Sequence, residues 1–127
     1  MTTITPIYNI QERTYRYAVD AIALYELVQK QRRPAGWIIA KQYLRSATSI
    51  GANMEEAKAG ESRADFIHKC SIAQKEARES LYWLRLLASS RLVNDQQVAA
   101  LIRETDELVS IITAIAKNAR RNAAHIP

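Results

Sequence analysis

Apolar side chains recur every three or four positions along residues 45–87, and this spacing constrains the fold more than any other feature of the chain. It keeps one face of an α-helix apolar, because such a helix has about 3.6 residues per turn. The pattern is interrupted at Gly60, Glu61 and Ser62. Ser62 can act as an N-cap, and the side chain of Asp65, three residues later, can accept a hydrogen bond from the Ser62 amide in return. The segment therefore predicts two helices that fold back on each other with their apolar faces together.

The composition is typical of one helical globular domain. The chain has 127 residues, of which 48% are hydrophobic and 24% charged, and only three are Gly and three Pro. Its one cysteine, Cys70, cannot form an internal disulfide, which fits a reducing cytoplasm. We find no apolar run near the roughly 20 residues of a membrane span, and no signal peptide at the start. We therefore expect a cytoplasmic protein without a membrane partner.

The same periodicity extends along most of the chain and predicts four helices. The predicted ranges are residues 10–31, 37–59 and 63–89, and a last helix from Asn94 or Asp95 to residue 119. Residues 1–9 form an N-terminal arm, part of which we expect to pack down through Ile4, Ile7 and Tyr8, and residues 120–127 a fraying basic tail. Long helices with short connections predict an all-α fold, an up-down-up-down antiparallel four-helix bundle in a single domain.

Each predicted helix contributes one apolar face to the core. The expected core residues are Ala18, Ala21, Ile22, Tyr25 and Val28; Ile39, Tyr43, Ala47, Ile50, Met54 and Ala57; Phe66, Cys70, Ala73, Ala77, Leu81 and Leu84; Val98, Leu101, Thr105, Leu108, Ile112, Ile115 and Ala119. Pro34 and Gly36 should break the chain between the first two helices. Gly51 costs about 1 kcal/mol inside a helix relative to alanine, so its small surroundings predict that another helix approaches closely there.

Antiparallel packing also predicts which polar residues share a height. Folding the second helix onto the third places Arg45 level with Glu76 and near Glu79. We expect Arg45 to contact Glu76 or Glu79, and such a contact would fix the register of the two helices. The candidate structural polar contacts are Arg45, Asn53, Glu76 and Glu79.

The sequence carries no pattern typical of catalysis or of a cofactor. A di-iron site in a helical bundle needs two Glu-x-x-His pairs, and the chain has only two histidines, His68 and His125. The glutamates alternate with basic residues, as on salt-bridged helix faces. Cys70 lies on an apolar face, and no Gly-rich phosphate loop is present. We therefore predict no catalytic residue, no metal and no cofactor, and we do not expect an enzyme.

The net charge of +5 favours anionic partners such as nucleic acid. Up-down topology gathers seven basic residues toward one end of the bundle, and these are the candidate nucleic-acid-binding residues: Arg13, Arg16, Lys58, Arg63, Lys117, Arg120 and Arg121. Several acidic residues lie at the same end. The alternative is therefore a protein–protein interaction scaffold whose charges are only solvated.

Five aromatic residues partly fall off the predicted core faces and suggest a subunit interface: Tyr15, Tyr17, Trp37, Tyr82 and Trp83. The candidate interface residues among them are Trp37, Tyr82 and Trp83. Tyr82 and Trp83 are adjacent, so they cannot both point at one apolar face. Exposed aromatic side chains are enriched where subunits meet.

The segments SATSIGANMEEA and ADFIHKCSIAQKEARESLYWLRLL resemble the four-helix-bundle proteins encoded in intervening sequences of bacterial 23S ribosomal RNA genes. The resemblance covers nearly the whole chain. The residues that carry it are Ser49, Ile50, Asn53, Glu56, Asp65, Phe66, Ile72, Ala73 and Glu79. Two positions depart from the family pattern, because Ala57 replaces a glycine and Glu76 replaces a serine.

This resemblance implies a homo-oligomer in the form of a pentameric ring. A related branch, the accessory proteins of diversity-generating retroelements, forms basic pentameric barrels that bind reverse transcriptase and nucleic acid. The implied partners are therefore further copies of the chain, RNA or DNA, and a reverse transcriptase where the gene lies beside one. No catalytic residues carry over, since the family defines none.

Overall fold

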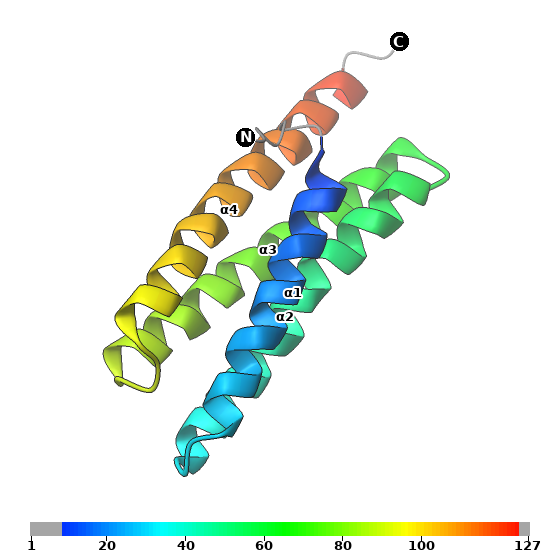
Figure 1. Ribbon diagram of the computed structural model, residues 1–127. Coiled ribbons are helices and arrows are strands. Elements are labelled where there is room, and N and C mark those ends of the chain that lie inside the picture. The colour runs from blue at the N-terminus through cyan, green and yellow to red at the C-terminus, as the bar shows by residue number, and fades with distance from the viewer. Residues whose placement is uncertain (1–8, 125–127) are drawn as a thin grey trace, which may run out of the picture.

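The computed structural model describes residues 9–124, and the side chains of residues 9–122. It contains four helices: α1 (Ile10–Gln29), α2 (Pro34–Ala59), α3 (Arg63–Ser89) and α4 (Asp95–Ala124) (Figure 1). No β-strand occurs in the described range. The predicted all-α class and the order of the helices are confirmed. The apolar residues predicted in the N-terminal arm lie outside the described residues.

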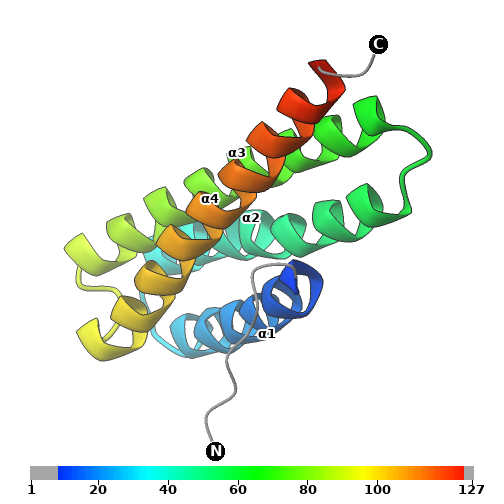
Figure 2. The same cartoon turned by 90° about the horizontal axis from the view of Figure 1, so that it is seen from above.

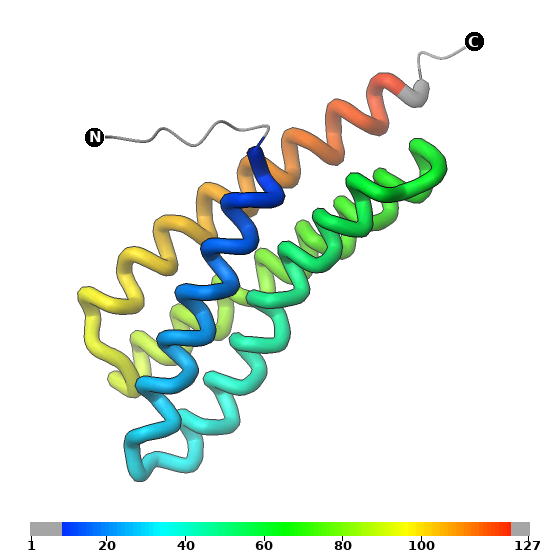
Figure 3. Tube along the Cα trace, turned by 45° about the vertical axis from the view of Figure 1, so that its right-hand side comes forward, coloured from blue at the N-terminus to red at the C-terminus, as the bar shows by residue number. Residues whose placement is uncertain are grey.

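Successive helices run in opposite directions and pack side by side in chain order. The start of α1, the α2–α3 connection and the end of α4 share one end of the bundle, and the other two connections lie at the opposite end (Figures 1 and 3). Contacts are most extensive between α2 and α3 and, among the helix pairs that touch, least extensive between α1 and α4. Seen from above, α4 crosses in front of α3 and α2, and α1 lies on the other side of α2 from α3 (Figure 2).

The core consists of the inward faces of all four helices. Tyr43, Ile50, Leu84, Leu108 and Ile112 are fully buried and come from α2, α3 and α4. They recur at helical spacing, so each helix removes one apolar stripe from water. Burial of this kind is the main favourable term in folding.

The predicted ends of the helices agree with the structure except at three places. α1 ends at Gln29, α2 begins at Pro34, and α4 continues to Ala124, beyond the predicted end at Ala119. Pro34 is tolerated in the first turn because its missing N–H would have no partner inside the helix. The predicted break therefore lies before Pro34, and Gly36 belongs to the helix.

The connections around α3 follow recognised capping geometry. The Ser62 hydroxyl accepts a hydrogen bond from the Asp65 amide at 3.1 Å, as the sequence predicts. At the other end Arg91 has a positive φ of 55°, and the amides of Arg91 and Leu92 donate to the carbonyls of Ala88 and Leu87. This pair of hydrogen bonds is a Schellman motif, which ends a helix and turns the chain.

The predicted core face of α1 is partly wrong. Tyr17 and Leu24 are buried, whereas Ile22 is 45% exposed and Tyr25 is half-buried. The buried row also includes Thr14, whose hydroxyl donates to the Ile10 carbonyl within the helix. The prediction that Tyr17 falls off the core face is therefore wrong. It counted apolar residues, whereas the Tyr17 hydroxyl finds its partners, Tyr43 and Thr105, on other helices of the folded chain. On α4, likewise, Ala116 is buried and Ile115 is half-buried.

The close approach expected at Gly51 is present, and the neighbour is α1. A Cβ atom on Gly51 would lie 3.2 Å from the Thr14 hydroxyl oxygen and 3.3 Å from its carbonyl oxygen.

Among the described helices, none is long and apolar enough to cross a membrane.

Candidate nucleic-acid interface

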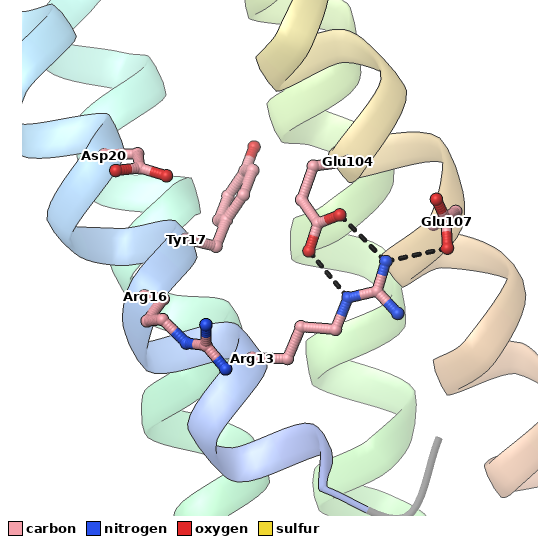
Figure 4. A pocket seen from close by; sticks show the side chains of 6 residues that line it. All are labelled: Arg13, Arg16, Tyr17, Asp20, Glu104 and Glu107. Carbon is pink, nitrogen blue, oxygen red and sulfur yellow. Dashed lines mark hydrogen bonds and ion pairs between the residues drawn. The ribbon is translucent and has the colours of Figure 1, made fainter. Parts of the chain in front are cut away.

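Arg13, one of the predicted nucleic-acid-binding residues, is engaged in an ion pair. Its guanidinium reaches from α1 to α4, where Nε lies 2.7 Å from Glu104 Oε2 and Nη2 lies 2.7 Å from Glu107 Oε1 (Figure 4). The hydrogen bond to Glu104 is the largest cause that raises the pKa of Arg13. Its side chain is only 15% exposed. Arg13 therefore joins α1 to α4, which touch less extensively than the other neighbouring helices, and its donors face carboxylates instead of phosphates.

A pocket of about 490 Å³ surrounds this ion pair between α1 and α4. Three carboxylates and two guanidinium groups line it together with one phenol: Arg13, Arg16, Tyr17, Asp20, Glu104 and Glu107 (Figure 4). Arg16 also lies 3.7 Å from Glu12 on its own helix. Because carboxylates outnumber cations here, the pocket does not favour a phosphate group.

Lys58 and Arg63 are exposed on either side of the α2–α3 connection, as the sequence predicts, but in acidic surroundings. A hollow of about 640 Å³ at this connection has Glu56, Glu61 and Asp65 in its wall. Lys69 neutralises part of this charge through a 2.8 Å ion pair with Glu56, which raises the pKa of Lys69. Within the described residues, no group of three or more His, Cys, Asp or Glu side chains could hold a metal ion.

Lys117, Arg120 and Arg121 form the most uniformly basic part of the predicted interface. All three are exposed on the last turns of α4. Glu107 is the last acidic residue in the sequence, so no carboxylate side chain follows on this part of the chain. Arg120 Nη2 donates to the Ser71 hydroxyl at 2.7 Å, which brings the basic end of α4 against α3.

The three predicted interface aromatics are not equally available. The Trp37 indole donates to the Gln31 carbonyl at 2.7 Å, and the half-buried Trp83 indole donates to Glu79 at 3.0 Å. Tyr82 is 59% exposed, and its ring centroid lies 5.0 Å from that of Trp83 in an edge-to-face arrangement. Tyr82 therefore presents the largest exposed fraction of the three.

A second apolar surface lies on α1, and the sequence prediction found only Tyr15 of it. Tyr15, Val19 and Ile22 are exposed at a spacing of four and then three residues, so they share one outer face of the helix. We call these three residues the α1 stripe. The signal was present in the sequence, because α1 carries apolar residues on two faces and only one of them can be the core.

Arg45 forms the contacts that the antiparallel register predicts. It hydrogen-bonds to Glu76, at 3.3 and 3.4 Å, and to Glu79. Glu76 is buried and also accepts from the Ser49 hydroxyl, and the Asn53 amide donates to the carbonyl and hydroxyl oxygens of Ser49. The hydrogen bond from Trp83, together with the one from Arg45, lowers the pKa of Glu79. Arg45 and Ser49 join α2 to the glutamates of α3, whereas the hydrogen bonds of Asn53 stay within α2.

A buried chain of hydroxyl groups crosses the core. The Tyr43 hydroxyl donates to Tyr17 at 3.0 Å, the hydroxyl oxygens of Tyr17 and Thr105 lie 2.6 Å apart, and Thr105 donates to the Leu101 carbonyl. Since Thr105 has one proton, Tyr17 must be the donor to Thr105. Burial raises the pKa of Tyr17 to about 12 and also raises that of Tyr43. In the described part of the chain no buried side-chain nitrogen or oxygen atom lacks a hydrogen-bond partner.

Comparison with known proteins agrees with this architecture. The sequence model of the 23S rRNA-intervening sequence protein family matches residues 9–114, which include most of the four helices. The chain belongs to this family. Among the curated proteins no match was found.

A solved structure supports the same assignment. A protein of unknown function from the S23 ribosomal protein family of Bacteroides thetaiotaomicron is 38% identical in sequence, with a TM-score of 0.79. The match covers 85% of this chain and 98% of the other. The predicted family resemblance is therefore confirmed.

Proposed function

We propose that the protein is a non-catalytic homo-oligomer that binds RNA or DNA through its basic surface. The observation that carries this proposal is the last part of α4. Residues that the sequence predicted to fray are helical as far as Ala124, so Lys117, Arg120 and Arg121 project from ordered turns. Cations held on a rigid element can neutralise phosphates with little loss of backbone entropy.

Oligomerisation would strengthen such a surface. The α1 stripe exposes three large apolar side chains, and contiguous exposed apolar surface is typical of subunit contacts. A closed ring repeats each basic patch around its axis, so weak contacts add through avidity. Membership in a family named for the 23S rRNA intervening sequence makes RNA the first nucleic acid to test.

The direct test is fluorescence anisotropy of a labelled, structured RNA titrated with the protein at low salt. We expect saturable binding by the natural sequence. The triple variant Lys117→Ala, Arg120→Ala and Arg121→Ala should bind more weakly, because three phosphate contacts are removed.

A matched control removes the same charge from the opposite end. Lys30, Arg32 and Lys41 are exposed, and their triple alanine variant should retain most of the affinity. If both variants lost RNA affinity equally, the effect would come from net charge alone and not from the end of α4. Absence of binding by the natural sequence at low salt would contradict the proposal and favour an interaction scaffold with solvated charges.

A further inference from the structure

A second basic surface runs along the outer face of α3. Lys75, Arg78, Tyr82 and Arg85 are all exposed and are spaced by three, four and three residues. This spacing places them in one row on a helix, over about 15 Å from the first to the last. We call this row the α3 stripe. It was not among the predicted binding residues, because that prediction grouped cations by the end of the bundle and not by the face of a helix.

The three cations of the α3 stripe are not held in ion pairs within the range that the structure describes, although, besides the hydrogen bond from Trp83, the charge of Lys75 contributes to lowering the pKa of Glu79. Among the described residues, none of Lys75, Arg78 and Arg85 forms an ion pair within 4.0 Å. The two glutamates of the same helix segment are engaged elsewhere, since both accept hydrogen bonds from Arg45, and Glu79 also accepts from Trp83. The stripe is therefore a row of positive charge that an external anion can approach.

Tyr82 occupies the middle of this row and is held in place. Its ring packs edge-to-face on Trp83, whose indole is fixed by the hydrogen bond to Glu79. A surface hollow of about 260 Å³ lies beside Tyr82 and is lined by Arg85, Leu86 and Ser89. This volume is below the roughly 300–1,000 Å³ of sites for drug-sized ligands, and it suits a single planar base or a ribose.

The α3 stripe is continuous with the basic end of α4. Ser71 lies one turn before Lys75 on the same face, and it accepts the hydrogen bond from Arg120. The two helices lie side by side along their length (Figures 1 and 2). One strand could therefore follow α3 and reach the cations of α4.

We propose that the α3 stripe binds single-stranded nucleic acid, with Lys75, Arg78 and Arg85 on the phosphates and Tyr82 stacked on an unpaired base. This inference rests on the proposed function and names its ligand and surface. Alternating cations and an exposed aromatic ring are the arrangement that single strands require. A duplex keeps its bases stacked inside the helix, where Tyr82 has no face to contact.

The test compares a short single-stranded RNA with the duplex of the same sequence. Tyr82→Ala should weaken single-strand binding by about 5- to 150-fold and leave duplex binding unchanged, whereas Tyr82→Phe keeps the stacking surface and the affinity. The triple variant Lys75→Ala, Arg78→Ala and Arg85→Ala should reduce the slope of log affinity against log salt by about 2. The triple variant of Lys30, Arg32 and Lys41 is the control of equal charge.

A second readout uses the tryptophan next to the stacking site. The chain has two tryptophans, so a Trp37→Phe protein emits from Trp83 alone. Its emission should change on binding the single strand, and this change should disappear with Tyr82→Ala. All substituted positions of the α3 stripe are exposed, and helical circular dichroism verifies that each variant folds.

Three results would overturn the inference. The first is that the α3 variants bind single strands as tightly as the control variant does. The second is that Tyr82→Ala weakens duplex binding as much as single-strand binding. The third is that Tyr82→Ala lowers the oligomer mass, which would place Tyr82 in a subunit contact. In each case RNA binding by the natural sequence would leave the proposed function intact. Failure of the natural sequence to bind any RNA would instead remove both.

Discussion

Several buried residues of the core carry a hydroxyl group. Thr14, Tyr17, Ser46 and Ser80 are buried although a pattern of apolar residues gives them no weight, whereas Thr105 lies on the predicted apolar face of α4. Tyr17, Ser46 and Ser80 have hydrogen-bond partners on other helices, for example Ser46 with Ser80 at 2.8 Å, and Thr14 donates to the Ile10 carbonyl of its own helix. The sequence could therefore predict the burial of Tyr43 and Thr105, which lie on regular apolar faces, but not the burial of Tyr17.

The phenol of Tyr17 predicts a loss of stability at alkaline pH. Its folded pKa of about 12 exceeds the unfolded value of 10.0, so its contribution is complete below pH 10 and is lost as the pH rises toward 12. A pKa difference of one between the folded and unfolded states corresponds to about 1.4 kcal/mol in the free energy of unfolding. Urea unfolding at pH 8, 10 and 11 should show the decline, and Tyr17→Phe should be less stable at pH 8 and less sensitive to pH above 10. A parallel decline in both proteins would contradict this role.

At the scale of the helices, the sequence predicts α3 best, because a capping serine and a register partner on α2 fix its position. The predicted range of α3 agrees with the structure, and Arg45 lies beside Glu76 and Glu79 as the antiparallel register requires. α1 was the exception, because it carries one apolar row toward the core and another toward solvent. Which row is buried depends on the hydroxyl partners of Thr14 and Tyr17, and these lie on α1 itself, on α2 and on α4.

The contact of α1 with α2 predicts that Gly51 tolerates no branched side chain. A Cβ there already meets the Thr14 backbone carbonyl at 3.3 Å, so Gly51→Val must push the two helices apart. We expect a loss of about 2 kcal/mol or more in the free energy of unfolding, as for other overpacked cores. Ala52→Val, at the exposed neighbouring position, is the control for β-branching and should cost less than about 1 kcal/mol in urea unfolding. Equal losses would contradict the close approach.

For the molecule as a whole, the exposed apolar residues of α1 predict self-association. Light scattering should give several times the protomer mass of 14.4 kDa for the natural sequence. Val19→Lys combined with Ile22→Lys should lower this mass, because charges in an apolar contact remain unpaired. Tyr82→Lys tests the interface predicted from the sequence and should keep the mass of the natural protein. A monomeric natural protein, or a mass reduced only by Tyr82→Lys, would contradict the assignment to α1.

The basic surface was only partly predictable from the sequence. The cations at the end of α4 were identified, since no acidic residue follows Glu107. The sequence also grouped Arg13 with them and could not show its ion pairs, because Glu104 and Glu107 are distant in sequence and meet it only in the fold. The α3 stripe needed the structure, because it had to be known that Glu76 and Glu79 turn toward Arg45.

The salt dependence of RNA binding is the most direct test of the central claim, which is that this protein binds RNA by neutralising its phosphates. The six side chains that would do so in each protomer are Lys75, Arg78, Arg85, Lys117, Arg120 and Arg121. Six such contacts with a single strand predict that log affinity falls linearly with log salt, with a slope of about −4 per protomer engaged. A slope near zero, or no binding at the lowest salt, would contradict the account.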